Sequence, residues 1–115
     1  MADGAAHRGE VWQVDFEPVR GHEQGRERPA VVVSADAFNA GPAALVVVCP
    51  ITTRERRIRF HVTVEPPEGG LRARSFVLCD QIRTVSTERL ISRLGVVRAV
   101  SLDSIDDRLR ILLDL

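Results

Sequence analysis

Short apolar runs, rich in β-branched residues and separated by turn residues, recur along this chain and constrain its fold more than any other feature. Runs of this length, bounded by Gly, Pro and charged residues, are typical of β-strands. Strands joined by turns, without a helix between each pair, favour a small and strongly bent barrel. The sequence therefore predicts a mainly β domain of six short strands, at residues 10–16, 29–33, 43–50, 58–64, 74–79 and 91–97, with residues 80–85 continuing the fifth strand after a bend.

Helical patterns are confined to short segments and to the C-terminus. Ser34 has the chemistry of an N-cap for a helical turn, and Ser101 has the same chemistry before the terminal helix. We expect Asp106 and Arg110 to form an exposed pair one turn apart on that helix. Its buried face is predicted from apolar residues at helical spacing, which are Leu102, Ile105, Leu109, Leu112 and Leu113.

The length of 115 residues fits one compact domain, which we place at residues 8–115 after a disordered tail of residues 1–7. No apolar run approaches the length of a membrane helix, and the first residues lack the apolar segment of a secretion signal. We therefore expect a cytoplasmic protein that makes no membrane contact.

The cysteine and histidine content predicts neither a metal site nor a bound cofactor. Cys49 and Cys79 each lie at the end of an apolar run, so we expect two buried, reduced thiols. Two thiols alone do not hold a metal, and the three histidines are far apart in the sequence.

The positive charge is concentrated locally, although the net charge is zero. All sixteen basic residues are arginine, and Arg54, Arg56, Arg57 and Arg59 fall within six positions. Such a patch on a neutral protein still concentrates its field, as nucleic-acid binding requires.

A polar loop at residues 22–27 leads into Arg28, which stands at the mouth of an apolar strand. Loops that a rigid strand positions often contain functional sites. We therefore expect Arg28 to be held in a defined place.

Five segments, in order and at this spacing, resemble the MazF/PemK/Kid family of toxin endoribonucleases. They are Arg8-Gly9-Glu10-Val11-Trp12 with Asp15-Phe16-Glu17-Pro18, Glu23-Gln24-Gly25, Arg28 to Ser34, Pro50-Ile51-Thr52-Thr53 and Asp80-Gln81-Ile82-Arg83-Thr84. The resemblance implies an SH3-like barrel of the CcdB/PemK type that forms a homodimer. It implies the toxin of a type II toxin–antitoxin system, neutralised by a MazE-like antitoxin. It further implies metal-independent, sequence-specific cleavage of single-stranded RNA (mRNA, rRNA or tRNA) through a 2′,3′-cyclic phosphate, which inhibits translation and growth.

The resemblance assigns catalysis to Arg28 and Thr52. A guanidinium can clamp two phosphate oxygens and a hydroxyl can donate to a third, but an arginine is a poor general base. His22 stands where the family commonly has a small residue, so it is either the base, a solvated loop residue or a residue that stacks on an RNA base. Glu23 and Gln24 either orient Arg28, read a base edge or bond only the loop backbone.

A larger set is expected to contact RNA, with alternatives left open. The loop arginines either grip phosphates or are solvated and paired with Glu55. Residues 80–83 either contact RNA or form a structural network, and Phe16 and Trp12 are expected in the core. We expect His61 on the wet face of its strand, and strand alternation allows only one of Thr52 and Thr53 to face the groove. The predicted RNA contacts are Arg26, Thr53, Arg54, Arg56, Arg57, Arg59, His61, Gln81 and Arg83.

Two other functions fit the same fold class: a protein-binding toxin that inhibits DNA gyrase, and a non-catalytic SH3-like interaction module. The interaction module usually presents an aromatic groove, and this chain has few aromatic residues. Incubation with single-stranded RNA in EDTA separates the three, since only the endoribonuclease produces cyclic-phosphate ends.

If His22 takes the 2′-proton, His22→Gln changes the pH dependence of the cleavage rate, because glutamine does not titrate near neutral pH. The measurement is the pH–rate profile of the wild-type and variant proteins on one RNA. An unchanged profile excludes His22 as the base.

Overall fold

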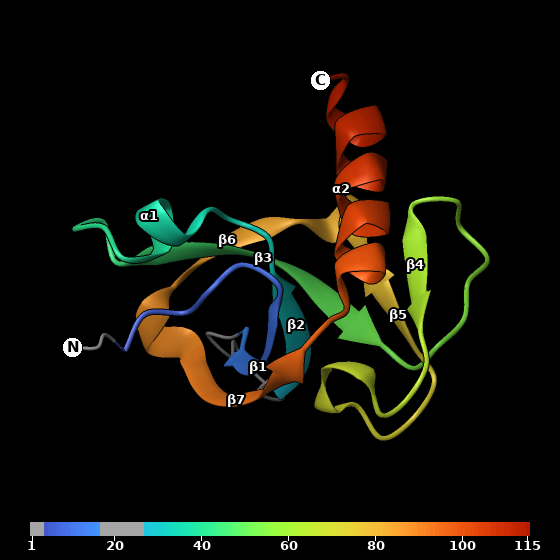
Figure 1. Cartoon of the computed structure of the whole chain (residues 1–115), viewed down its shortest axis with the longest axis horizontal. Helices are drawn as coiled ribbons and strands as arrows, with labels where there is room; N and C mark the ends of the chain where they lie inside the picture. The colour runs from blue at the N-terminus through green and yellow to red at the C-terminus, as the bar shows by residue number, and fades with distance from the viewer. Residues whose placement is uncertain (1–3, 17–26) are drawn as a thin grey trace, which may run out of the picture.

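A computed structural model describes residues 4–16 and 27–115 as an antiparallel sheet crossed by one long helix (Figure 1). The strands are β1 (Glu10–Asp15), β2 (Glu27–Val32), β3 (Leu45–Thr52), β4 (His61–Val64), β5 (Ser75–Leu78), β6 (Arg83–Ser86) and β7 (Leu90–Val96). The helices are α1 (Asp36–Asn39) and α2 (Ala99–Leu113), with 3₁₀ turns η1 (Glu68–Gly70), η2 (Cys79–Gln81) and η3 (Thr87–Arg89). The mainly β fold with a C-terminal helix is confirmed.

Strand β3 is the centre of the sheet. It pairs with β2 along one edge and with β5 and β6 along the other, and the strand order is β4-β5-β3-β2-β1-β7. The strands β4 and β7 end this order and do not pair with each other, so the bent sheet of the described residues does not close into a full barrel.

The strand predicted to continue after a bend is interrupted by η2. Val77 of β5 lies opposite Ile51, whereas Arg83 of β6 lies opposite Val48. The β5–β6 side therefore contains more residues than β3 across the same length, as in an enlarged β-bulge. Asp80 and Gln81 occupy this interruption, and their side chains are released from the alternation of a regular strand.

Each face of the sheet has its own apolar core, because successive side chains of a strand point to opposite faces. The core under α2 contains Ile105 of that helix, with Leu102 and Leu109 packed against it. Its strand residues include Val11, Val31, Cys49, Ile51, Val77 and Cys79. The core on the other face contains Ala6, Val14, Ala30, Val32, Val46, Val48 and Val85.

Cys49 and Cys79 are free and fully buried, as predicted. A hydrogen bond with the Cys79 thiol and burial both raise the pKa of Cys49. Cys49 is therefore a neutral core residue and not a nucleophile.

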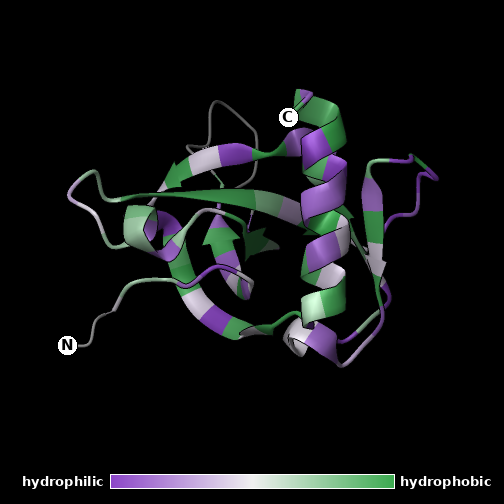
Figure 2. Ribbon diagram, turned by 45° about the horizontal axis from the view of Figure 1, so that its top comes forward, coloured by the Kyte–Doolittle hydropathy of each residue, from purple (hydrophilic) through white to green (hydrophobic). Residues whose placement is uncertain are grey.

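Helix α2 begins earlier than predicted, and its N-cap residue and the ion-pair partner of Asp106 also differ from the prediction. Arg98 is its N-cap, and Ser101 lies buried inside the first turn. Asp106 does not pair with Arg110 but with the guanidinium of Arg8, which ties the helix to the start of the sheet. In the described part of the chain, no helix is both long and apolar enough to cross a membrane. Figure 2 shows that α2 alternates hydrophilic and hydrophobic residues along its length, as a helix with one buried face does.

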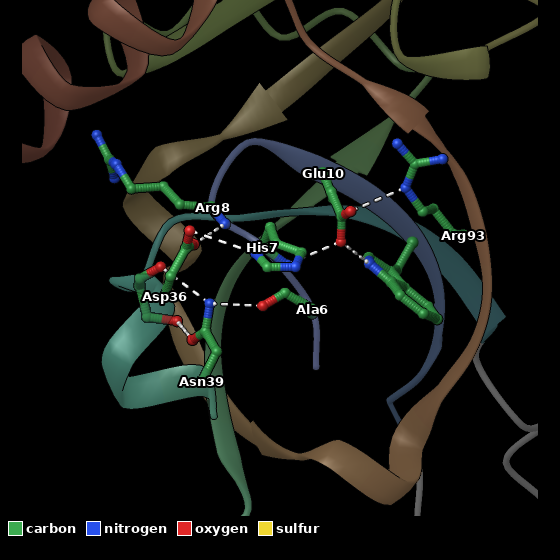
Figure 3. Close-up of polar contacts among 9 residues, drawn as sticks. Ala6, His7, Arg8, Glu10, Asp36, Asn39 and Arg93 are labelled. Atoms are coloured by element: carbon green, nitrogen blue, oxygen red, sulfur yellow. Dashed lines mark hydrogen bonds and ion pairs between the residues drawn. The ribbon is translucent and has the colours of Figure 1, made fainter. Parts of the chain in front are cut away.

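The predicted tail of residues 1–7 includes residues that the structure attaches to the domain (Figure 3). Ala6 is buried, and its carbonyl accepts a hydrogen bond from the Asn39 amide at 3.1 Å. The Ser34 hydroxyl bonds the side chain of Asn39 and accepts from the Val47 amide instead of capping α1. The tail prediction is therefore wrong for Ala6.

Glu10 is a buried carboxylate at the same place (Figure 3). It accepts hydrogen bonds from the His7 backbone amide at 2.8 Å, the Trp12 indole at 2.9 Å and the Arg93 guanidinium at 2.9 Å. Burial raises the pKa of Glu10, but the three hydrogen bonds and the charge of Arg93 outweigh burial, so that the pKa lies below its ordinary value of 4.5.

We expect Glu10→Gln to lower the free energy of unfolding by about 1–3 kcal/mol at pH 7, because buried donors lose their charged acceptor. A lowered folded-state pKa gives stability that is present above the unfolded pKa and is lost as the pH falls through the folded pKa. Urea unfolding should therefore show the difference shrinking below a pH of about 4.5. The exposed Glu88→Gln variant is the control, and an equal effect there contradicts the role of Glu10.

Candidate active site

One face of the sheet changes from apolar to polar at a single end. The end of β1, the start of β2, the end of β3 and the start of β6 meet there, because these neighbouring strands are antiparallel. Two residues further along each strand from the second core, with the same side-chain direction, lie Phe16, Arg28, Pro50 and Arg83. Thr52 lies a further two residues beyond Pro50 on the same strand. The alternation that builds this core thus also gathers the site.

The larger hollow at this end, here called the arginine groove, has a volume of about 530 Å³. Among the residues that the structure describes, its lining has three guanidinium groups, two threonines and one amide, and no acidic side chain. The lining is Arg28, Thr52, Thr53, Arg54, Arg56, Leu78 and Gln81. Such a surface favours an anion, and the fork of each arginine matches two oxygens of a phosphate.

A smaller hollow of about 220 Å³, here called the Phe16 pocket, adjoins the groove. It is lined by Phe16, Arg28, Pro50, Gln81 and Arg83, so the two hollows share Arg28 and Gln81. The guanidinium carbon of Arg83 lies 5.1 Å from the centroid of the Phe16 ring. Phe16 packs against the second core, as expected, but the sequence interpretation did not place it in the site.

The hydroxyl of Thr52 has a defined orientation. Its oxygen accepts a hydrogen bond from the backbone amide of Arg54 at 3.1 Å, which leaves the O–H free to donate into the groove. Thr53 also lines the groove, so the expectation that only one threonine faces it is wrong. Thr53 follows the last residue of β3 and is not held to strand alternation.

The nearby acids are directed to other partners. Glu55 pairs with Arg74 at 4.0 Å, not with the loop arginines. Asp80 bonds the Nε2 atom of His61 at 3.0 Å. Within residues 4–16 and 27–115, Arg28, Arg54 and Arg56 have no carboxylate partner, and all three line the arginine groove.

The prediction that His61 lies on the solvent-exposed face of its strand is wrong. Its side chain is only 5% exposed, and its Nδ1 atom is buried without a partner among the described residues. It therefore cannot stack on a base as positioned here. Its contact with Asp80 anchors η2, the turn that presents Gln81 to both hollows.

The remaining predicted site residues divide into two groups. Arg57 and Arg59 lie in the β3–β4 loop, which Figure 2 shows as mostly hydrophilic, but neither lines either hollow. The Arg59 guanidinium lies 5.7 Å from the Phe60 ring centroid. Outside the described residues lie His22, Glu23, Gln24 and Arg26.

Fold and site together define a small antiparallel β domain with a cationic, hydroxyl-bearing groove suited to a phosphodiester chain. The sequence matches the PemK-like, MazF-like toxin of type II toxin–antitoxin systems over residues 7–113. The chain belongs to this toxin family.

Individual proteins of this kind are similar over nearly the whole chain. Endoribonuclease MazF9 of Mycobacterium tuberculosis is 40% identical, across 94% of this chain and 96% of that protein. A MazE–MazF crystal structure from Deinococcus radiodurans has a TM-score of 0.85 at 32% identity, covering 98% of this chain and 99% of its own. An endoribonuclease from a mycobacterial species, in complex with its cognate antitoxin, has a TM-score of 0.81 at 30% identity, covering 96% and 97%.

Proposed function

We propose that this toxin is an endoribonuclease that cleaves single-stranded RNA in the arginine groove without a metal ion. The observation that supports the proposal is the joint presence of Arg28 and Thr52 in one groove, whose described lining residues include no acid. The described lining residues present no charge that repels a polyanion, and its phosphates find preorganised donors there. The similar proteins whose names include endoribonuclease support the same activity.

Cleavage follows from attack by the ribose 2′-oxygen on the adjacent phosphorus. A new P–O2′ bond forms, the P–O5′ bond breaks, and the products have a 2′,3′-cyclic phosphate and a 5′-hydroxyl. Negative charge grows on the non-bridging oxygens during attack, where donors stabilise it most. Arg28 binds these oxygens with its fork and Thr52 donates its hydroxyl hydrogen. His22 is the proposed base.

The RNA contacts extend from this centre in both directions. Arg54 and Arg56 bind phosphates of the strand within the groove, while Gln81 and Arg83 face the neighbouring nucleotide. The sequence preference is set by two polar segments of the chain, residues 22–27 and 53–60.

The proposed partners are a second copy of the chain and an antitoxin, all in the cytoplasm. The end of α2 supports dimerisation, since Ile111, Leu113 and Leu115 are exposed apolar residues. Leu113 and Leu115 also line a hollow of about 420 Å³. A MazE-like antitoxin is supported by the similar endoribonuclease whose structure includes its cognate antitoxin. An acidic or apolar antitoxin segment fits over the arginine groove.

We expect Arg28→Ala to lower the cleavage rate at least 100-fold, the scale seen when one transition-state donor is lost. Its folding should stay intact. The assay is cleavage of single-stranded RNA in EDTA, with the cyclic phosphate identified at the new ends. Arg57→Ala, which removes an arginine outside the groove, is the matched control. An active Arg28→Ala protein removes Arg28 from catalysis.

Salt dependence separates groove arginines from the others. Arg54→Ala and Arg56→Ala should each reduce the slope of log affinity against log salt concentration by roughly one phosphate contact. Arg57→Ala should leave the slope almost unchanged. Fluorescence anisotropy of labelled RNA across a salt series gives the slopes, and equal slopes in all three variants contradict the proposed path.

A further inference from the structure

We infer that the Phe16 pocket binds one unpaired base of the RNA, next to the phosphate at which the chain is cut. The inference rests on the proposed ribonuclease function and adds Phe16, which holds the Arg83 guanidinium as a stacking platform for that base.

The dimensions of the pocket restrict its occupant. Its volume of about 220 Å³ lies below the range of roughly 300–1,000 Å³ typical of sites that enclose a drug-sized ligand. It is therefore suited to a single ring system and not to a whole nucleotide. A sugar and its phosphate would lie outside, in the larger arginine groove, where the phosphate donors are.

The position of the pocket fixes which base it receives. Arg28 and Gln81 line both hollows, so the Phe16 pocket lies directly beside the proposed reaction centre. A nucleotide whose phosphate lies against Arg28 has its base within reach of Phe16. The occupant is therefore the base of one of the two nucleotides that flank the cut.

Arg83 presents a flat, charged surface to that base. Its guanidinium lies over the Phe16 ring at 5.1 Å, an arrangement that holds the group without a carboxylate. No carboxylate is paired with Arg83 in the described part of the chain. In the inferred complex the base stacks on the plane of this guanidinium, as unpaired RNA bases stack on arginine planes.

The pocket also offers polar groups to the base edge. Gln81 has an amide with both donors and an acceptor, and Arg83 has N–H donors in the plane of its guanidinium. Aromatic, cationic and amide groups thus converge on one hollow. Packing of the apolar core does not require this combination of groups. In a merely structural role, Phe16 would require only Pro50 and the second core beside it.

The test uses the full chain and RNA oligonucleotides in which one ribose at a time, on either side of the cut, lacks its base. Loss of the base from the bound position should weaken binding about 5- to 100-fold, the range for a lost base–aromatic stack. Loss at more distant positions should have a smaller effect. Anisotropy gives the dissociation constant for each oligonucleotide, and cleavage is followed separately.

Two variants test the platform. Phe16→Leu keeps an apolar side chain against the core but removes the ring, and Arg83→Lys keeps the charge but removes the flat face. Each should weaken binding of intact RNA and abolish the penalty for the missing base at that one position. Phe60→Leu is the matched control, because Phe60 also lies beneath an arginine, at 5.7 Å, but outside the pocket.

The outcomes distinguish this inference from the proposed function. Failure of the wild-type protein to cleave any RNA contradicts the ribonuclease, while the binding series still tests the pocket. A penalty that persists unchanged in Phe16→Leu and Arg83→Lys, or no penalty at either flanking position, overturns the one-base pocket. If Phe16→Leu shows a lowered melting temperature and altered circular dichroism, Arg83→Lys alone decides.

Discussion

The pairing of β3 along both of its edges is the constraint on which the rest of the structure depends. A strand bonded on one side to β2 and on the other to β5 and β6 cannot shift by one residue, because its valines would then leave their cores. Arg28 and Thr52 belong to paired strands of this block, so their backbones are fixed before any ligand arrives. Preorganisation of this kind is what electrostatic stabilisation of a transition state needs.

The strands and the terminal helix were predictable because valine runs, turn residues and a helical apolar stripe are local signals. The resemblance to a toxin family also identified the groove residues Arg28, Thr52 and Gln81. Strand alternation, applied past the ends of the strands, could have placed Phe16 there too. It was assigned to the core alone because an aromatic residue is usually buried, whereas this one packs on the core and lines a pocket.

Other features depend on contacts between distant segments that no local pattern reveals. Asp106 was expected to pair one turn along its helix but pairs with Arg8, which the fold brings to it. The alternation of apolar and polar residues in its strand predicts an exposed His61. In the structure the His61 side chain contacts Asp80, which lies on the 3₁₀ turn η2. The small and polar residues around Ala6 predict a disordered tail, but the Asn39 side-chain amide donates a hydrogen bond to the Ala6 carbonyl.

The η2 interruption has a consequence for the evolution of such proteins. Asp80 and Gln81 belong to neither the β5 nor the β6 ladder, so replacing their side chains leaves the pairing with β3 in place. Gln81 nevertheless borders both hollows. Natural variation at this position can therefore diversify what the groove recognises while the stability of the scaffold is conserved.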